Sequence, residues 1–127
     1  MMIPHEQSPP SHLLVAIRQF NNREWYECHE TLEEMWRGSQ GELRAFLQGT
    51  LRVAVALHHW RNGNLRGCLK LLDSGVDCLC RVPGVFLSVD VTSFIREIKR
   101  MKTALEDRGN ERSPLVVHAC IPIIRVI

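Results

Sequence analysis

Apolar residues return every three or four positions along most of the chain, and this spacing predicts a protein built from α-helices. Glycine, asparagine and proline interrupt the pattern at intervals, and residues of these types end or restart helices. We therefore expect an all-α, single-domain bundle of about five helices with a central antiparallel helix hairpin. The expected helices cover residues 11–20, 23–37, 39–61, 64–82 and 90–109.

Polar residues at the expected helix starts are of the kinds that cap helices. Ser11 can cap the first helix, and Ser39, with Glu42 three residues later, has the sequence of a capping box for the third. Gly63 suits the left-handed position that follows the third helix, and Asn64 can cap the fourth. Because so few residues separate these two helices, we expect them to form the antiparallel hairpin.

The C-terminal residues keep the apolar character but lose the helical spacing. Residues 114–127 are rich in β-branched side chains, which are unfavourable to expose together. We expect this segment to lie extended across the domain, or to cover a second subunit in a homo-oligomer. The expected organisation is one domain (1–127) with an N-terminal arm (1–10), a helical bundle (11–109) and an extended apolar tail (110–127).

The composition is typical of one globular domain, with 127 residues, 45% of them hydrophobic and 24% charged. A formal net charge of only +2 argues against a dedicated nucleic-acid-binding protein. The five cysteines are an odd number, and Cys78 and Cys80 lack the spacing of zinc or redox pairs, so we expect free thiols in a reducing cytoplasm. The longest nearly apolar run, 115–124, is too short to span a membrane.

Three residues are spaced as ligands of one metal ion. His29 and Glu33 stand one helical turn apart on nearly the same side of the second expected helix. His58 lies on the core-facing side of the third. If these two helices pack together, His29, Glu33 and His58 can converge and leave a coordination position open for water. Zinc, manganese or iron held there would activate that water, as in a metal-dependent hydrolase.

Other polar side chains flank this group, and the spacing leaves a second interpretation open. Gln48 or His59 could complete the site at its edge, with Arg52 on the same polar flank of the third helix. Alternatively, Glu33 accepts a hydrogen bond from His29 or His58, and the cluster only satisfies buried polar groups. The sequence His29-Glu30-Thr31-Leu32-Glu33 also differs from the His-Glu-x-x-His motif of zinc proteases.

The segment 20–36, FNNREWYECHETLEEMW, resembles the opening motif of the domain-of-unknown-function family numbered 309. That motif is an aromatic-rich helix that carries a histidine, a glutamate four residues later and a tryptophan three further. Later positions match as well: Arg44, residues 46–49, Ala54, residues 56–58, residues 63–64, Gly67 and residues 71–72. The resemblance covers roughly residues 20–79.

The resemblance implies a compact all-helical bundle from bacteria or archaea whose function is not established. Members of that family are catalogued as predicted metal-dependent hydrolases. Carried over to this chain, the resemblance nominates His29, Glu33, Gln48 and His58, with Trp36 lining the site.

Two functions therefore remain open. One is a hydrolase with a divalent metal on His29, Glu33 and His58. The other is a non-enzymatic interaction module, because the expected hairpin of helices three and four resembles one tetratricopeptide-like unit. In that case the apolar tail would serve a homo-oligomer or a protein partner, and the His–Glu cluster would be structural. Nucleic-acid binding through surface arginines is the weakest alternative.

Overall fold

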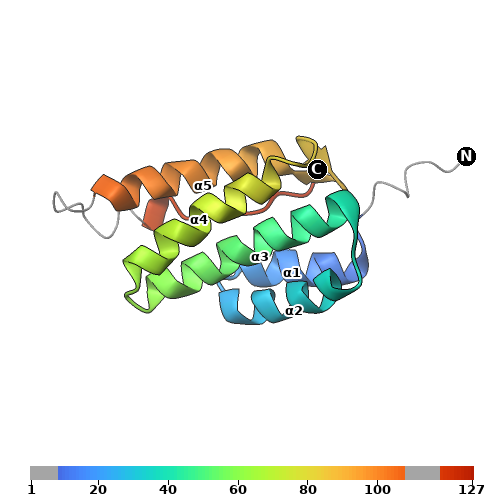
Figure 1. The fold of residues 1–127 in the computed structure, drawn as a ribbon, viewed down its shortest axis with the longest axis horizontal. Coiled ribbons are helices and arrows are strands. Elements are labelled where there is room, and N and C mark those ends of the chain that lie inside the picture. Colours follow the sequence, from blue (N-terminus) through green and yellow to red (C-terminus); the bar gives the residue numbers. More distant parts are fainter. Residues whose placement is uncertain (1–8, 108–117) are drawn as a thin grey trace, which may run out of the picture.

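The computed structural model describes residues 9–107 and 118–127, and five helices contain most of them. The predicted all-α bundle is confirmed. The bounds are α1 (Ser11–Asn21), α2 (Trp25–Arg37), α3 (Gly41–Arg61), α4 (Leu65–Leu79) and α5 (Val91–Glu106) (Figure 1). No helix in the described part of the chain is both long and apolar enough to cross a membrane.

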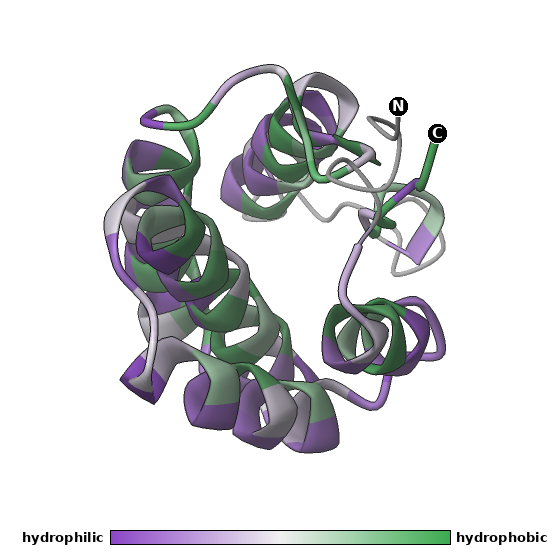
Figure 2. Cartoon of the chain, turned by 90° about the vertical axis from the view of Figure 1, so that its right-hand side faces the viewer, coloured by the Kyte–Doolittle hydropathy of each residue, from purple (hydrophilic) through white to green (hydrophobic). Residues whose placement is uncertain are grey.

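Helices that follow one another in sequence pack against one another in space. The closest pairs are α3 with α4 and α2 with α3, which makes α3 the central helix, as its apolar circumference indicates. Seen along the bundle, the hydrophobic segments of the helices face a common interior (Figure 2). The largest fully buried side chains come from every helix: Trp25, Phe20, Phe46, Phe94, Leu13, Leu32, Leu47, Leu57, Leu72, Leu79, Ile98 and Met101.

The backbones of α3 and α4 approach closely where two glycines face each other. A Cβ atom on Gly75 would lie 2.7 Å from Val53 Cγ2 and 3.0 Å from the carbonyl oxygen of Gly49. A Cβ atom on Gly49 would lie 2.8 Å from Leu79 Cγ and 2.9 Å from the carbonyl oxygen of Gly75. Real Cβ atoms do not come this close, so the hairpin depends on glycine at both positions.

The turn of this hairpin forms as its sequence predicts. Gly63 has a φ of +85°, in the left-handed region that favours glycine. The Asn64 side chain accepts a hydrogen bond from the Gly67 N–H at 2.9 Å and so caps α4. Helix α4 ends at Leu79, a few residues before the Pro83–Gly84 stop.

Two of the other expected caps are wrong. Pro10 is the residue before α1, and Ser11 is already helical, so no side chain caps this helix. At α3 the residue before the helix is Gln40, and no capping box forms. The Ser39 hydroxyl instead donates to the carbonyl oxygen of Trp36, in the last turn of α2, at 2.7 Å.

A short hairpin between α4 and α5 was not predicted. Strand β1 (Val85–Phe86) pairs antiparallel with β2 (Val89–Asp90). The two residues of its turn, Leu87 and Ser88, both have positive φ values, 51° and 63°. The strands are too short to show an alternating pattern, and the turn lacks the Asn-Gly sequence that usually marks such hairpins.

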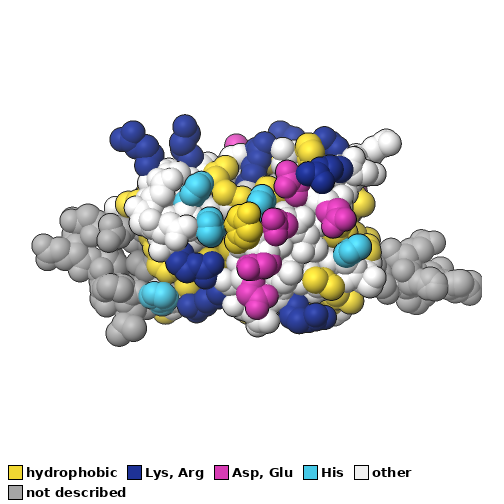
Figure 3. All heavy atoms as spheres, turned by 90° about the horizontal axis from the view of Figure 1, so that it is seen from below, with side chains coloured by type: hydrophobic (Ala, Val, Ile, Leu, Met, Phe, Trp, Pro, Cys, Tyr) yellow, Lys and Arg dark blue, Asp and Glu magenta, His cyan; other side chains and the backbone are white. Residues whose placement is uncertain are grey.

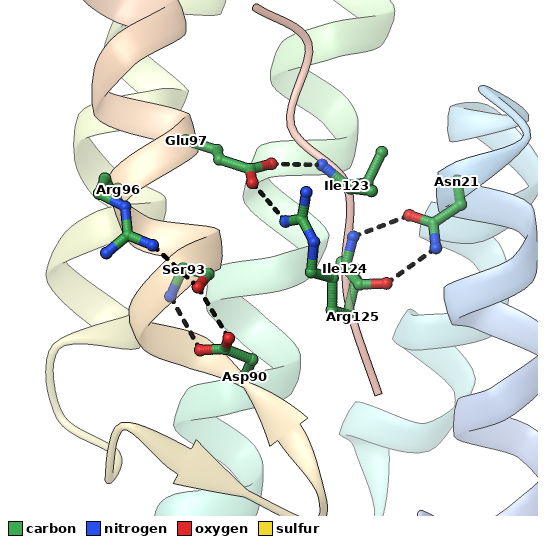
Figure 4. A network of polar contacts seen from close by, with 8 residues as sticks. All are labelled: Asn21, Asp90, Ser93, Arg96, Glu97, Ile123, Ile124 and Arg125. Atoms are coloured by element: carbon green, nitrogen blue, oxygen red, sulfur yellow. Dashed lines mark hydrogen bonds and ion pairs between the residues drawn. The ribbon is translucent and has the colours of Figure 1, made fainter. Parts of the chain in front are cut away.

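The described part of the tail lies across the domain between α1 and α5. The Asn21 side chain binds the backbone of Ile124 twice, donating to its carbonyl oxygen and accepting from its N–H, each at 2.8 Å (Figure 4). Glu97 on α5 accepts from the N–H of Ile123 at 3.1 Å and pairs with Arg125. Ile124 is thereby buried. Asn21 on α1 and Glu97 on α5 therefore bind the tail from its two sides.

The end of the tail also joins the short hairpin. Val126 forms a β-bridge with Val89. Asp90, the residue after Val89, caps α5. Its carboxylate accepts from the Ser93 N–H at 3.0 Å and from the Ser93 hydroxyl at 2.7 Å (Figure 4). These bonds, the backbone one first, hold the pKa of the Asp90 carboxyl below its ordinary value. The predicted start of the fifth helix near Asp90 is confirmed, whereas its expected end at Gly109 lies outside the described residues.

Candidate functional site

The orientation of α2 is fixed by the residues that it buries. The chain turns at Arg23, whose φ is 65°, and α2 begins two residues later than expected, at Trp25. Trp25, Cys28 and Leu32 enter the core, so His29 falls at the edge of the buried face. This position keeps the imidazole close to the core and still accessible from outside.

His29 and Glu33 are brought together as their spacing predicts. The distance from His29 Nε2 to Glu33 Oε1 is 3.7 Å, and their side chains are 25% and 44% exposed. The other ring nitrogen, Nδ1, lies 3.2 Å from the carbonyl oxygen of Tyr26, so that nitrogen donates. Glu33 also lies 3.9 Å from a guanidinium nitrogen of Arg37. The His–Glu pair is thus an i, i+4 contact at the helix surface.

His58 on α3 shares an aromatic neighbour with His29. The Tyr26 ring centroid lies 5.5 Å from that of His29 and 5.6 Å from that of His58. His58 Nε2 lies 3.1 Å from the amide nitrogen of Asn62, so Nε2 accepts. The neutral ring then carries its proton on Nδ1, which is buried and has no hydrogen-bond partner among the described residues. A tyrosine ring therefore contacts both histidines.

These side chains line a small pocket between α2 and α3. Its volume is about 120 Å³, and its lining residues are Trp25, Tyr26, His29, Val55 and His58. Binding pockets for drug-sized molecules have volumes of roughly 300–1,000 Å³, so this pocket would hold only a small group. Glu33 is not among its lining residues.

The donors present do not form the expected three-ligand metal site. Within residues 9–107 and 118–127, no three His, Cys, Asp or Glu side chains are grouped closely enough to hold one metal ion. His29 and Glu33 form a pair, while His58 bonds to Asn62 and contacts the Tyr26 ring instead. The structure therefore brings His29 and Glu33 together but does not group His58 with them.

The residues expected to flank this site lie in different surroundings. Arg52 donates to the Ser74 hydroxyl and lies 3.7 Å from Cys78 Sγ, so it faces α4 and not α2. Trp36 lies near the other end of α2, where the Arg44 guanidinium stacks 3.8 Å from its ring centroid. Gln48 and His59 are half-buried on α3, and neither lines the pocket.

A second pocket, which sequence reasoning missed, adjoins the first at Trp25. It has a volume of about 340 Å³ and is lined by Arg23, Trp25, Trp60, Arg61 and His118. His118 is far away in sequence and reaches this place only because the tail returns along the bundle. No local spacing could have revealed it.

Acidic side chains form a group on the surface of α1 and α2. Figure 3 views the molecule from the side of α1 and α2. Acidic side chains gather in the middle of this face, and lysine, arginine and histidine side chains lie around them. The acidic group agrees with the outward positions of the glutamates on α2.

These features define a small helical-bundle protein with a histidine–tyrosine pocket between its second and third helices. Residues 13–71 match the model of the family described as Domain of unknown function (DUF309), so this part of the chain is similar to that family and the predicted resemblance is confirmed.

Two bacterial relatives extend this result. The chain is 31% identical over 72 residues to the uncharacterized protein YpuF of Bacillus subtilis, and 24% identical over 83 residues to an uncharacterized protein of Aquifex aeolicus. The matched segments cover 56% and 62% of this chain, but only 41% and 25% of those proteins. The chain thus matches less than half the length of either relative.

Proposed function

We propose that this chain is a non-enzymatic binding module, and that the face formed by α2 and α3 is its binding surface. The observation that carries the proposal is the place of Tyr26, whose ring contacts both His29 and His58. An aromatic ring beside two half-buried imidazoles supplies stacking and hydrogen-bonding surface. It does not supply the convergent lone pairs that a metal needs.

The architecture supports this role. The closely packed hairpin of α3 and α4 gives α2 a rigid support, and pockets on rigid elements need little reorganisation on binding. The relatives support it too, because the matched segment is a minor part of longer proteins. A segment used in this way is typical of a module that contributes binding to a larger chain.

The competing function is a metal-dependent hydrolase that uses His29, Glu33 and His58. It requires the two imidazoles and the carboxylate to point at one position. Glu33 instead lies outside the pocket that the histidines share, and Tyr26 occupies the space beside both rings. The geometry therefore favours binding over hydrolysis.

Elemental analysis of the tag-free protein, purified without chelator and then incubated with zinc, manganese or iron, separates the two functions. We expect far less than one metal per chain, with no difference between the parent and a His29→Ala/Glu33→Ala variant. A His59→Ala/Glu30→Ala variant is the matched control, because it removes the same residue types outside the pocket. About one metal per chain, lost in the first variant and kept in the second, would overturn the proposal.

A further inference from the structure

The pocket of Arg23, Trp25, Trp60, Arg61 and His118 combines positive charge with flat apolar surface. The Arg61 guanidinium stacks over the Trp25 ring, 4.4 Å from its centroid. The Trp60 ring contacts Trp25 on one side and His118 on the other, with centroid distances of 6.3 and 5.2 Å. A ligand that enters would meet indole faces and guanidinium edges together.

The two arginines have donors to spare. Arg61 donates to the carbonyl oxygen of Arg23 at 2.7 Å, and Arg23 lies 3.3 Å from His118 Nδ1. Each guanidinium carries five N–H donors, so most remain available. No carboxylate among the described residues forms an ion pair with either arginine, although Glu24 and Glu27 lie nearby in sequence. The positive charge of this pocket is therefore not neutralised by the described part of the chain.

Two further donors lie in the same region. Trp25 is only 1% exposed, and its indole Nε1 is buried without a hydrogen-bond partner in the described structure. Trp25 is also the first residue of α2, and the preceding Glu24 makes no side-chain cap. The first N–H groups of a helix attract anions when no cap satisfies them. The free N–H groups at the start of α2 are independent of the arginines and favour an anionic ligand, whereas the buried Trp25 Nε1 is not exposed to the pocket.

We propose that this pocket binds a small molecule in which a phosphate is joined to a flat ring, of the class of nucleoside monophosphates. Guanidinium groups suit phosphate because their N–H donors match its oxygens in pairs. The half-buried Trp60 ring supplies aromatic surface that suits a planar base, whereas the Trp25 ring is covered by Arg61. The volume of about 340 Å³ lies at the small end of ligand pockets, which fits a mononucleotide better than a longer polymer.

This inference rests on the proposed binding role and names its ligand class. The test is a calorimetric titration of the full chain with adenosine monophosphate, ribose 5-phosphate, adenosine and inorganic phosphate. We expect the monophosphate to bind at least about tenfold more tightly than any of the other three, since only it engages both the arginines and the indoles. Added salt should weaken its binding.

Variants place the binding in this pocket. Arg23→Gln and Arg61→Gln should each weaken monophosphate binding about tenfold or more. Arg66→Gln removes the same charge from the exposed start of α4 and should bind like the parent. Arg23 is exposed, and its side chain has one hydrogen bond within the described residues, to His118, so Arg23→Gln is informative even if Arg61→Gln unfolds.

The outcomes separate this inference from the proposed function. A metal-free protein that binds monophosphate no better than adenosine, or equally well after Arg23→Gln, overturns the ligand class alone. Conversion of the monophosphate to adenosine and phosphate during the titration, followed by phosphorus NMR, would overturn the non-enzymatic role and leave the ligand class standing.

Discussion

The two sides of α3 pack against their neighbouring helices in different ways. Toward α4 the helix packs backbone against backbone, with Gly49 and Gly75 in a contact too tight for any Cβ atom. Toward α2 it meets large aromatic and imidazole side chains that leave two pockets, of about 120 and 340 Å³. One helix thus serves as the support of the fold on one side and as the wall of a binding surface on the other.

Buried polar atoms without a hydrogen bond also differ between these two sides of α3. The described residues contain three buried side-chain nitrogens without a hydrogen bond: Trp25 Nε1, Trp36 Nε1 and His58 Nδ1. All three belong to α2 or α3, and none belongs to α4 or α5. Leaving such a donor unsatisfied costs roughly 1–3 kcal/mol each, a cost that natural proteins usually avoid. Trp25 and His58 belong to residues that line the pockets, whereas Trp36 lies near the other end of α2.

The largest expected effect concerns the reactivity of the cysteine thiols. It tests whether the buried face of α2, which carries Cys28, is as closed to solvent as that of α4, which carries Cys68. Burial raises the pKa of the Cys28 thiol, next to His29, from its ordinary value of 9.0 to about 12, and that of Cys68 on α4 equally. At neutral pH each then holds about a thousandfold less reactive thiolate than an ordinary cysteine. Alkylation of the native protein, followed by mass spectrometry, should label the exposed Cys80 first and leave Cys28 and Cys68 unmodified.

Denatured protein is the control, and there all the cysteines should react alike. Rapid native labelling of Cys28 with Cys68 still protected would show that the open character of the α2 side is not confined to its pockets but extends to the side of α2 that faces α1. The Cys28 thiol lies 3.3 Å from the carbonyl oxygen of Ala16 on that side.

The sequence predicts the packed side of α3 better than the open side. The turn at Gly63 and Asn64 and the start of the fifth helix near Asp90 depend on local chemistry, and each forms as expected. The capping box at Ser39 fails because α3 begins at Gly41, with Gln40 and not Ser39 as the residue before it. The hairpin of β1 and β2 escapes prediction because its turn uses Leu87 and Ser88, residues with no preference for positive φ.

The candidate site shows a second limit. Spacing correctly places His29 and Glu33 on one side of α2, since both lie on one helix. It cannot give the contact between α2 and α3, which depends on how the whole core packs, so the role of Tyr26 beside His58 was not foreseen. The pocket that includes His118 requires the path of the tail, which follows from contacts between residues about a hundred positions apart.

The glycine contact of the packed side should respond strongly to a single methyl group. Gly75→Ala would force a Cβ atom to within 2.7 Å of Val53 Cγ2 and 3.0 Å of the Gly49 carbonyl oxygen. Overpacking of this kind costs about 1–3 kcal/mol, against a gain of up to ~1 kcal/mol for alanine in a helix. We expect a net loss of about 1–2 kcal/mol in the free energy of unfolding, measured by urea denaturation.

Gly38→Ala is the matched control for that experiment. A Cβ atom on Gly38 would meet no atom within 4 Å, and its φ of −104° is open to any residue. Its stability should stay within about 0.5 kcal/mol of the parent. Equal stability of Gly75→Ala and Gly38→Ala would mean that α3 and α4 are not in the close contact on which the comparison depends.

The open side should respond in the opposite direction. His58→Phe keeps a ring of similar shape beside Tyr26 but removes the buried Nδ1 donor that has no partner in the described structure. The variant loses the half-exposed contact of Nε2 with Asn62, worth about 0.5 kcal/mol, and avoids a desolvation cost of about 1–3 kcal/mol. We therefore expect a gain of about 1 kcal/mol in the free energy of unfolding. His59→Phe on the same turn is the control and should change little, because no hydrogen bond of its side chain is replaced. A loss of stability in His58→Phe alone would show that its Nδ1 is satisfied in solution, and α2 and α3 would then form a structural interface like that between α3 and α4.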